Sequence, residues 1–590
     1  MEDQKNFILA MVLSMLVLIG YYQFFGKPMA EEARRQAEFE QEMAEEALAT
    51  PVQPAAVETI AESLRIPVRT PAMEGSFQLR GFRFDDLKLL DYDATLEDGS
   101  PNVALLVPEG GDFASYVTDN WVPVDGGSGL RSEWQLVSGE TVTPDSAVVV
   151  RLEGEGFRVD RTVSVADRYL LEVSDVVTNT SGESINLERK GAARQHGLPD
   201  GLINFMLLQE GPIAVVDGRL TDMKYGKLAK ERQMVETGAP GWAGLTDKYW
   251  LQAAVAPREA PMTAEFQYSF INNEDVYEAG YTTQPLTLTA GASVTSVGHL
   301  FTGAKERALL ERLEDEYAID ELNRAIDWGT LRILVKPMTT VLNWLGGVIG
   351  NFGLAIMALT LLIKVVLFPV FNKQYTSMAK MRKVAPELTR LRERYSAPED
   401  RMQLQQEMMA LYKKEGVNPL SGCLPIIPTI FVFFALYKTI LIDVELRHAP
   451  FFGWIRDLSA QDPLSVLNGF GLLPWGPEPL GLAFLAIGPL ALMYGASFAL
   501  MQTLQTPGGD PMQRKIFAFL PWVFMFIIAP FAAGLLVYWV WNNILGFLQS
   551  YYINKKYGTE IPLETFFAKL FGRAKTVGGE GVEVLPPEKK

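Results

Sequence analysis

The sequence predicts a polytopic α-helical membrane protein with six transmembrane helices, a large all-β external sandwich and a helical hairpin on the opposite side. Apolar residues gather into membrane-length runs, and short alternating runs typical of strands fill the segment between the first two. A basic segment follows the second run. At 590 residues the chain is too long for one core, so several units are expected.

Six apolar segments, each able to cross a bilayer core, define the predicted transmembrane helices. The run near Met1 is not followed by a small-x-small cleavage site, which favours a retained anchor over a removable signal. The last two helices share one long uncharged run, which Pro530 and Gly534 would turn back on itself. We predict these helices at residues 1–25, 351–371, 421–442, 480–504, 515–533 and 534–554.

The distribution of basic residues predicts the orientation. Residues 372–420 are rich in Lys and Arg, whereas the loop 443–479 holds only two arginines. Because basic loops face the cytoplasm, we place residues 372–420, both termini and the tail 555–590 on that side. Residues 26–300 are then external, and they hold nearly twice as many acidic as basic residues, which accounts for the net charge of -17.

The external part divides into three predicted pieces. Residues 26–57 are charged and rich in Ala and Pro, as in a flexible linker. Residues 58–303 alternate like strands and predict a β-sandwich, in which no nucleophile or paired-carboxylate motif stands out; this favours a structural or docking role. Residues 304–350 predict a charged helix and then an amphipathic one on the outer membrane surface, with Trp328 and Trp344 as interfacial anchors. A soluble helix packed on the sandwich is the alternative.

The basic segment 372–420 predicts two helices, because apolar residues recur at intervals of three and four on both sides of the SAPED break at 396–400. In one interpretation the apolar stripe simply joins the two helices into a hairpin. In the other, Met378, Met381 and Met408 belong to a basic, Met-rich platform for incoming chains or a ribosome.

Metal and disulfide chemistry are not expected. Cys423 is the single cysteine, so no intrachain disulfide can form. The histidines, His196, His299 and His448, are far apart and show no metal-binding spacing. We therefore predict no metal, no cofactor and no catalytic residue.

Two lysines interrupt membrane runs, and their depths differ. Lys438 lies four residues from the outer end of its predicted helix, roughly 6 Å, so its side chain can reach water. Lys364 lies seven residues from the inner end at Phe371, roughly 10 Å, which exceeds that reach. Because the apolar runs contain no Asp or Glu, Lys364 indicates a water-filled cavity; local bilayer thinning with partial snorkelling is the alternative.

Several motifs in a fixed order resemble the YidC-type membrane protein insertases of Gram-negative bacteria. They are NFGLAIMALTLLIKVVLFPVFNKQYTSMAKM, KEGVNPLSGCLPIIPTIFVFFALYK, VELRHAPFFGWIRDLSAQDP and DPMQRKIFAFLPWVF. The resemblance covers essentially the whole chain. It implies a five-helix core that forms a groove open to the cytoplasm and lipid but closed to the outside, with the sandwich in the periplasm.

The resemblance also implies which side chains meet the client protein. Lys364 falls at the groove's positive charge, where the family usually has Arg; Lys keeps the charge but lacks the planar fork of a guanidinium. The third core segment reads PTIFVFF, where the family commonly has Gln before a Pro, and this moves the proline to Pro428. The other implied groove residues are the hydroxyl of Thr360, the apolar Ile430 and Phe433, and the pair Tyr538 and Trp539, where the family usually has Tyr.

The function implied is that of a membrane protein insertase and chaperone of the bacterial inner membrane, which is not an enzyme. The implied partners are nascent membrane proteins, the ribosome, the Sec translocon with its accessory subunits, and membrane lipids, but no specific nucleic acid sequence. Two other classes stay open from the residues. A secondary transporter would normally show coupling acids and repeated halves, and a periplasmic ligand sensor would need a cytoplasmic output domain.

Overall fold

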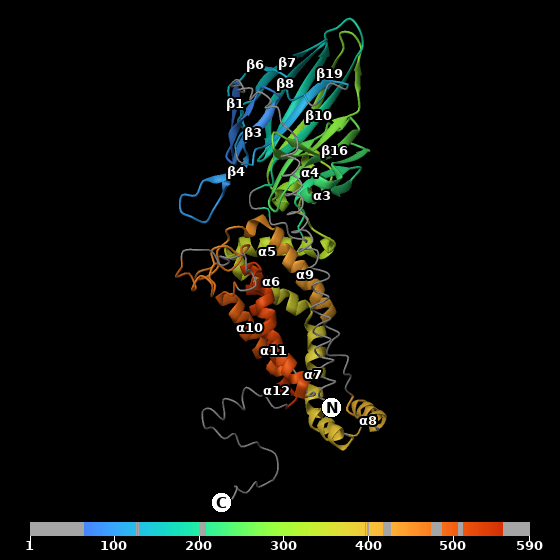
Figure 1. The fold of residues 1–590 in the computed structure, drawn as a ribbon, viewed down its shortest axis with the longest axis vertical. Helices are drawn as coiled ribbons and strands as arrows, with labels where there is room; N and C mark the ends of the chain where they lie inside the picture. Colours follow the sequence, from blue (N-terminus) through green and yellow to red (C-terminus); the bar gives the residue numbers. More distant parts are fainter. Residues whose placement is uncertain are drawn as a thin grey trace, which may run out of the picture. The chain divides into compact units, whose positions relative to one another are not determined.

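The computed structural model describes residues 64–558 except 112, 125, 126, 128, 200, 201, 203–207, 396, 398, 399, 417–425, 474–485 and 506–510. Two compact units make up this part of the chain (Figure 1). The first runs to Thr330 and includes Ile442–Glu445, and the second holds Leu331–Leu441 and the residues from Leu446 onwards. The predicted anchor 1–25, the linker 26–57 and most of the tail 555–590 lie outside the described residues.

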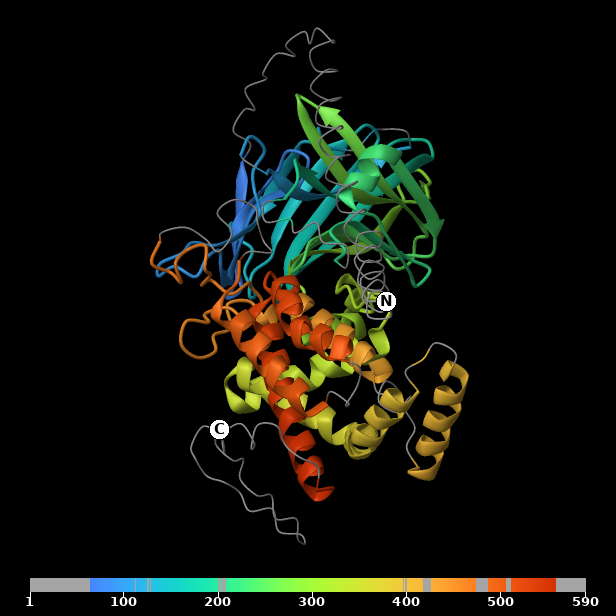
Figure 2. The same ribbon diagram turned by 60° about the horizontal axis from the view of Figure 1, so that its bottom comes forward.

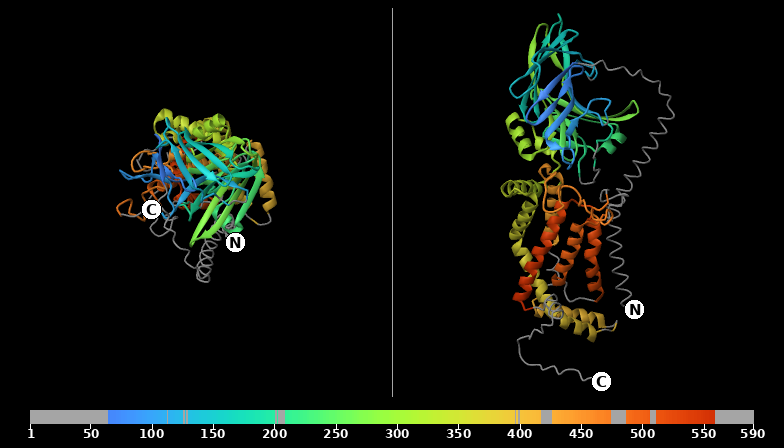
Figure 3. Two further views of the ribbon diagram at one scale, coloured as in Figure 1. Left: turned by 90° about the horizontal axis from the view of Figure 1, so that it is seen from above. Right: turned by 90° about the vertical axis from the view of Figure 1, so that its left-hand side faces the viewer.

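The first unit is a sandwich of two antiparallel sheets, which confirms the predicted all-β domain (Figure 3). The ten-stranded sheet follows the order β1-β2-β3-β5-β10-β17-β16-β13, while β4 pairs with β3 and β18 pairs with β10. Its strands are β1 (Arg65–Arg69), β2 (Met73–Gln78), β3 (Arg83–Asp93), β4 (Asn102–Leu106), β5 (Ser115–Pro123), β10 (Ile185–His196), β13 (Gln233–Gly238), β16 (Met262–Ile271), β17 (Glu274–Thr283) and β18 (Leu286–Leu288).

The nine-stranded sheet follows the order β12-β11-β14-β15-β19-β9-β8-β7-β6. Its strands are β6 (Trp134–Ser138), β7 (Val148–Gly154), β8 (Phe157–Asp167), β9 (Leu170–Asn179), β11 (Gly211–Val216), β12 (Arg219–Asp222), β14 (Trp242–Thr246), β15 (Trp250–Val255) and β19 (Ser293–Ala304). The same unit carries α3 (Tyr225–Glu231), α4 (Arg307–Tyr317) and a 3-10 turn, η2 (Leu322–Ala325).

Strand β8 shows how the sequence builds the core. Its alternating residues Phe157, Val159, Arg161 and Val163 are all buried, so the strand's inward face contains an arginine where an apolar side chain would be expected. A buried guanidinium needs partners for its charge and its N–H groups. The facing strands supply them.

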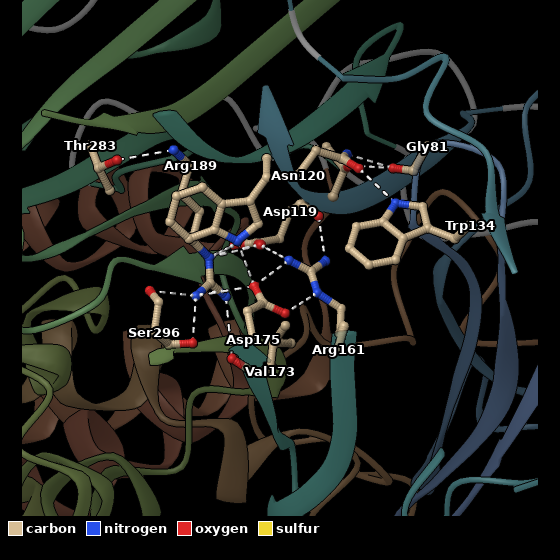
Figure 4. Close-up of polar contacts among 12 residues, drawn as sticks. Gly81, Asp119, Asn120, Trp134, Arg161, Val173, Asp175, Arg189, Thr283 and Ser296 are labelled. Atoms are coloured by element: carbon tan, nitrogen blue, oxygen red, sulfur yellow. Dashed lines mark hydrogen bonds and ion pairs between the residues drawn. The ribbon is translucent and has the colours of Figure 1, made fainter. Parts of the chain in front are cut away.

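Arg161 is part of a fully buried, charge-balanced network at the centre of the sandwich (Figure 4). Its Nη2 lies 2.7 Å from Asp119 Oδ1 on β5, and its Nε lies 2.7 Å from Asp175 Oδ1 on β9. Arg189 Nε on β10 lies 2.9 Å from the same Asp119 oxygen. Tyr281 donates to Asp119 at 2.7 Å. These contacts join the two sheets through paired charges rather than through apolar packing alone.

The two arginines also control the protonation state of Asp175. Burial raises the pKa of this carboxyl, but the charges of Arg161 and Arg189 outweigh that effect and hold it below its ordinary value. Trp121 adds a hydrogen bond to the ionised form at 2.8 Å. The carboxylate is therefore ionised in the folded sandwich.

Arg161→Met should destabilise the sandwich by about 3–5 kcal/mol, because it leaves two buried carboxylates with one arginine. Arg151→Met is the matched control: Arg151 pairs with Asp160 at 2.6 Å on the same sheet but is 37% exposed, so its loss should cost at most about 1 kcal/mol. The measurement is denaturant unfolding of the sandwich in the detergent-solubilised full-length protein. Equal losses in the two variants would contradict the buried network's importance.

The second unit is helical. Its helices are α5 (Arg332–Ile349), α6 (Phe352–Val366), α7 (Phe368–Arg394), α8 (Arg401–Lys414), α9 (Ile426–Ile442, whose last residue lies with the first unit), α10 (Pro489–Gln505), α11 (Pro511–Ile528) and α12 (Ala533–Lys556). Among the described residues, no single helix is both long and apolar enough for a membrane span, although α6 and the first part of α7 meet that test together as a bent pair. The six transmembrane helices stay a prediction.

The structure divides the predicted helix 351–371. Helix α6 ends at Val366, and α7 starts at Phe368 with its axis turned by 72°. Pro369 lies in the first turn of α7, where its missing N–H costs nothing, but a continuous helix would lose a hydrogen bond there. Lys364 therefore lies in the last turn of α6, not seven residues from a helix end.

Lys438 also differs from its sequence-based interpretation. Its side chain does not simply extend to water, because the residue is only 8% exposed in α9. The neighbouring Thr439 is fully buried, and its hydroxyl lies 3.4 Å from that of Thr339 on α5. This part of α9 is an interior element of the helical unit.

Candidate functional site

Lys364 lies where α6, α7 and α12 meet. The bend after α6 brings the ring of Phe371 to 4.7 Å from Lys364 Nζ, a cation–π contact. A Cβ placed on Gly546 of α12 would come within 3.6 Å of this Nζ and 3.2 Å of the Tyr375 hydroxyl. Within the described part of the chain, no carboxylate forms an ion pair with Lys364. The ammonium is thus half-buried beside aromatic groups.

Thr360 lies one helical turn before Lys364 and is fully buried. Its hydroxyl donates to the carbonyl oxygen of Ile356 at 2.7 Å, so its proton is used within α6 and only its oxygen lone pairs stay available. Trp541 of α12 donates to the carbonyl oxygen of Met357 at 3.1 Å. Sequence reasoning missed both Trp541 and Gly546, which fix α12 against α6.

An aromatic cluster joins α9, α10 and α12. Phe433 and Trp539 are stacked, with ring centroids 5.3 Å apart and planes at 13°. Tyr494 and Phe531 lie 5.6 Å and 5.8 Å from the Trp539 ring. Ile430, three residues before Phe433, is 46% exposed. The structure therefore brings Phe433 and Trp539 together and leaves Ile430 accessible.

Tyr538 is not part of this stack. It is 4% exposed, and its neighbour Trp539 is the residue that meets Phe433. Successive residues of a helix point in different directions, so only one of the two can face the cluster. Of the aromatic pair named from the sequence, Trp539 is the one on the Phe433 side.

One face of α12 connects the aromatic cluster with Lys364. Trp539, Asn543 and Gly546 follow one another at intervals of four and three residues, so they lie on the same side of the helix. Asn543 is buried and donates to Ser497 Oγ of α10 at 3.2 Å. From Trp539 to Gly546 is roughly 10 Å along the axis. An apolar stack, a polar pair and the lysine thus follow one line.

Helices α7 and α8 lie side by side (Figure 2). Val384 and Leu388 of α7 are buried, and Met381, Met408, Leu411 and Tyr412 pack against them. Met378 packs instead against the cluster of Phe371, Tyr375, Ala379 and Ile553. These contacts favour the interpretation in which the apolar stripe joins the helices. The exposed methionines of α8 are Met402 and Met409, at 73% and 61%.

The two tryptophans predicted as interfacial anchors have different surroundings. Trp328 is 4% exposed and donates to the carbonyl oxygen of Asn323 at 2.9 Å within the sandwich unit, so it is an interior residue and not an anchor. Trp344 of α5 is 63% exposed. Cys423 lies outside the described residues.

Comparisons with known proteins cover both units. The family model for the YidC periplasmic domain matches residues 65–341, and that for the 60Kd inner membrane protein matches residues 344–560. The membrane protein insertase YidC of Maricaulis maris is 42% identical over 97% of this chain and 99% of its own length. The corresponding protein of Cereibacter sphaeroides strain KD131 is 40% identical over 95% of this chain and 94% of its own.

A crystal structure described as an active YidC insertase with its first transmembrane domain resolved also matches. It is 17% identical, covers 83% of this chain and 92% of that chain, and has a TM-score of 0.35. The family assignment comes from the sequence relatives, whose identity extends over nearly the full length of both chains. The chain therefore belongs to the YidC family of membrane protein insertases, which are inner-membrane proteins with a periplasmic domain.

Proposed function

We propose that this insertase moves its clients through a hydrophilic groove in the helical unit, and that Lys364 is the groove's single positive charge. The clients are nascent membrane proteins, received alone or together with the ribosome, the Sec translocon and its accessory subunits. No bond is made or broken. Because the chain belongs to the insertase family, we no longer retain the secondary transporter and the periplasmic ligand sensor as alternatives.

The proposed topology has six spans. The N-terminal anchor precedes a five-helix core of α6, α9, α10, α11 and α12, and both termini face the cytoplasm. Residues 372–420 are rich in basic side chains, and basic segments favour the cytoplasmic side of a membrane. This composition supports a cytoplasmic position for α8 and for all of α7 after its first turn. The periplasmic domain is on the other side.

Helix α5 supports an outer-surface position in this topology. Its residues Val335, Thr339 and Leu342 are buried. Its opposite face carries Ile333, Trp344 and Val348, exposed at 84%, 63% and 68%. A helix with one buried face and one exposed apolar face fits the boundary of the outer leaflet, where Trp344 would anchor it.

One observation carries the proposed mechanism: Lys364 and the Phe433–Trp539 stack lie along one face of α12. A client's acidic or polar end would meet the ammonium, and its apolar segment would pass Ile430, Phe433 and Trp539 towards lipid. The bend at Leu367 limits α6 to 15 residues, so Lys364 lies near the inner end of a short apolar helix. The positive charge of Lys364 and the short length of α6 both lower the electrostatic barrier to moving a polar client segment across the membrane.

Charge, rather than guanidinium geometry, should decide activity at position 364. We expect Lys364→Arg to retain insertion activity. Lys364→Glu should lower the insertion of clients with acidic translocated tails by at least about tenfold, and Lys364→Ala should lower insertion for those clients only. The measurement is protease protection of the translocated tail after synthesis with inverted membranes. A client with an uncharged tail is the control.

The same position gives a direct test of hydration. In a Cys423→Ser background, Lys364→Cys should react with a membrane-impermeant maleimide added from the cytoplasmic side and not from the periplasmic side. A thiol that reacts from neither side would mean a dry site and would exclude the proposed groove.

The exposed face of α8 should receive incoming chains. Replacing both Met402 and Met409 with Asp should reduce crosslinking of arrested nascent chains severalfold while leaving the hairpin folded, because these side chains contact solvent. Met408→Asp is the comparison, since it buries a carboxylate in the α7–α8 contact and should instead destabilise the hairpin, seen as faster proteolysis. Unchanged crosslinking in the double variant would leave the hairpin as a connector.

A further inference from the structure

Residues 450–464, which lie between α9 and α10, contact the beginnings of three core helices. At α6, Asn351 caps the helix by accepting from Leu354 N at 3.0 Å, and its amide donates to the carbonyl oxygen of Pro450 at 3.4 Å. The ring of Phe451 lies so close to Gly353 that a Cβ there would come within 2.0 Å of it. This end of α6 is therefore covered by the segment.

The same segment supplies hydrogen-bond acceptors to α12. The first N–H groups of a helix lack partners inside it, and the N-cap residue Ala532 has no side-chain acceptor. The carbonyl oxygen of Ala460 accepts from Ala533 N at 2.7 Å, and that of Leu458 accepts from Gly534 N at 2.8 Å. The backbone of Leu458–Ala460 thus replaces a capping side chain.

Asp462 makes the equivalent contact to α10. Its Oδ2 accepts from Leu490 N, in the first turn of α10, at 3.1 Å. Its Oδ1 accepts from Trp454 Nε1 at 3.0 Å and from Leu464 N at 3.1 Å. The carboxylate is 1% exposed, and a Cβ on Gly488 would come within 2.5 Å of Oδ2. A buried carboxylate at the positive end of a helix is favourably placed.

We propose that residues Leu458–Asp462 form an outer latch, which ties the starts of α10 and α12 together and keeps the client path closed to the periplasm. Asp462 is its positioning residue. The inference rests on the proposed orientation, in which the starts of α6, α10 and α12 face outwards. Below the latch, Ser497 of α10 and Asn543 of α12 are the polar pair that would be uncovered first if the two helices separated.

The test places a thiol at that pair. In full-length protein in membranes, with Cys423→Ser, Ser497→Cys reports access through its reaction with a membrane-impermeant maleimide added to the periplasmic side. Ser497 is 9% exposed, so slow labelling is expected with the latch intact. Asp462→Ala should raise this periplasmic labelling rate at least tenfold. The labelling rate from the cytoplasmic side should stay unchanged, whereas a general loosening of the fold would raise both rates.

Three further variants isolate the hydrogen bonds. Asp462→Asn keeps one oxygen acceptor, but its NH2 group would face either Leu490 N or the donors of Trp454 and Leu464, so this variant should label at an intermediate rate. Asp457→Ala is the matched control, because this carboxylate accepts only from Ser459 among the hydrogen bonds described for it and should not change the rate. Trp454→Phe removes one hydrogen-bond donor to Asp462 and should give an intermediate labelling rate. This variant tests the latch even if the Asp462→Ala protein does not accumulate in the membrane.

The outcomes separate the latch from the proposed function. Unchanged periplasmic labelling in Asp462→Ala and in Trp454→Phe overturns the latch. Fast periplasmic labelling with the latch intact overturns instead the outward-closed core on which the inference rests. An Asp457→Ala rate equal to that of Asp462→Ala would overturn the latch with Asp462 as its positioning residue, because the effect would then belong to the loop as a whole.

Discussion

The bend at Leu367 is the constraint on which the geometry of the helical unit depends. It ends α6 two residues after Lys364, brings the ring of Phe371 next to Lys364, and directs α7 towards its contact with α8. Were α6 to continue straight, the lysine would lie deep in a longer apolar helix instead of in the last turn of a short one. Gly546 completes the arrangement, because a Cβ there would come within 3.0 Å of Met501 Sδ and 3.2 Å of the Tyr375 hydroxyl, so these two side chains would have to shift slightly.

The chain buries charge in two contrasting ways. In the sandwich, Arg161 and Arg189 are matched by Asp119 and Asp175, so the network is neutral and its groups are engaged. Such a centre favours one folded structure and presents no net charge to a ligand. Within the described ranges of the chain, Lys364 contacts an aromatic ring and forms no ion pair with a carboxylate. An ammonium without a carboxylate partner retains the capacity to attract a passing negative charge, and this is the role that we propose for Lys364.

Much of the fold follows from local patterns, but the site depends on contacts that no local pattern encodes. Alternation in segments such as FRVDRTVSV predicts strands, yet nothing in it reveals that Arg161 meets Asp119 and Asp175 across the sandwich. Trp328 is buried in the sandwich unit, although a tryptophan beside an apolar run resembles an interfacial residue. Lys364 lies nearer to a helix end than the sequence predicts: the apolar run continues through Phe371, but Pro369 favours a new helix start. Gly546 could have been suspected as a glycine inside a helix; Trp541 gave no such signal.

The buried network of the sandwich has a consequence for the order of events during biogenesis. Asp119 and its partner Tyr281 are 162 residues apart in the chain, and Arg161, Asp175 and Arg189 come between them. A chain crossing the membrane from its amino-terminal side therefore exposes unpaired charges of this centre until β10 has emerged, and Asp119 gains its hydrogen bond from Tyr281 only after β17 follows. Stable assembly of the domain must wait for nearly the whole of it to be exported, so the protein that helps others into the membrane passes through a long interval in which its own largest domain is incomplete.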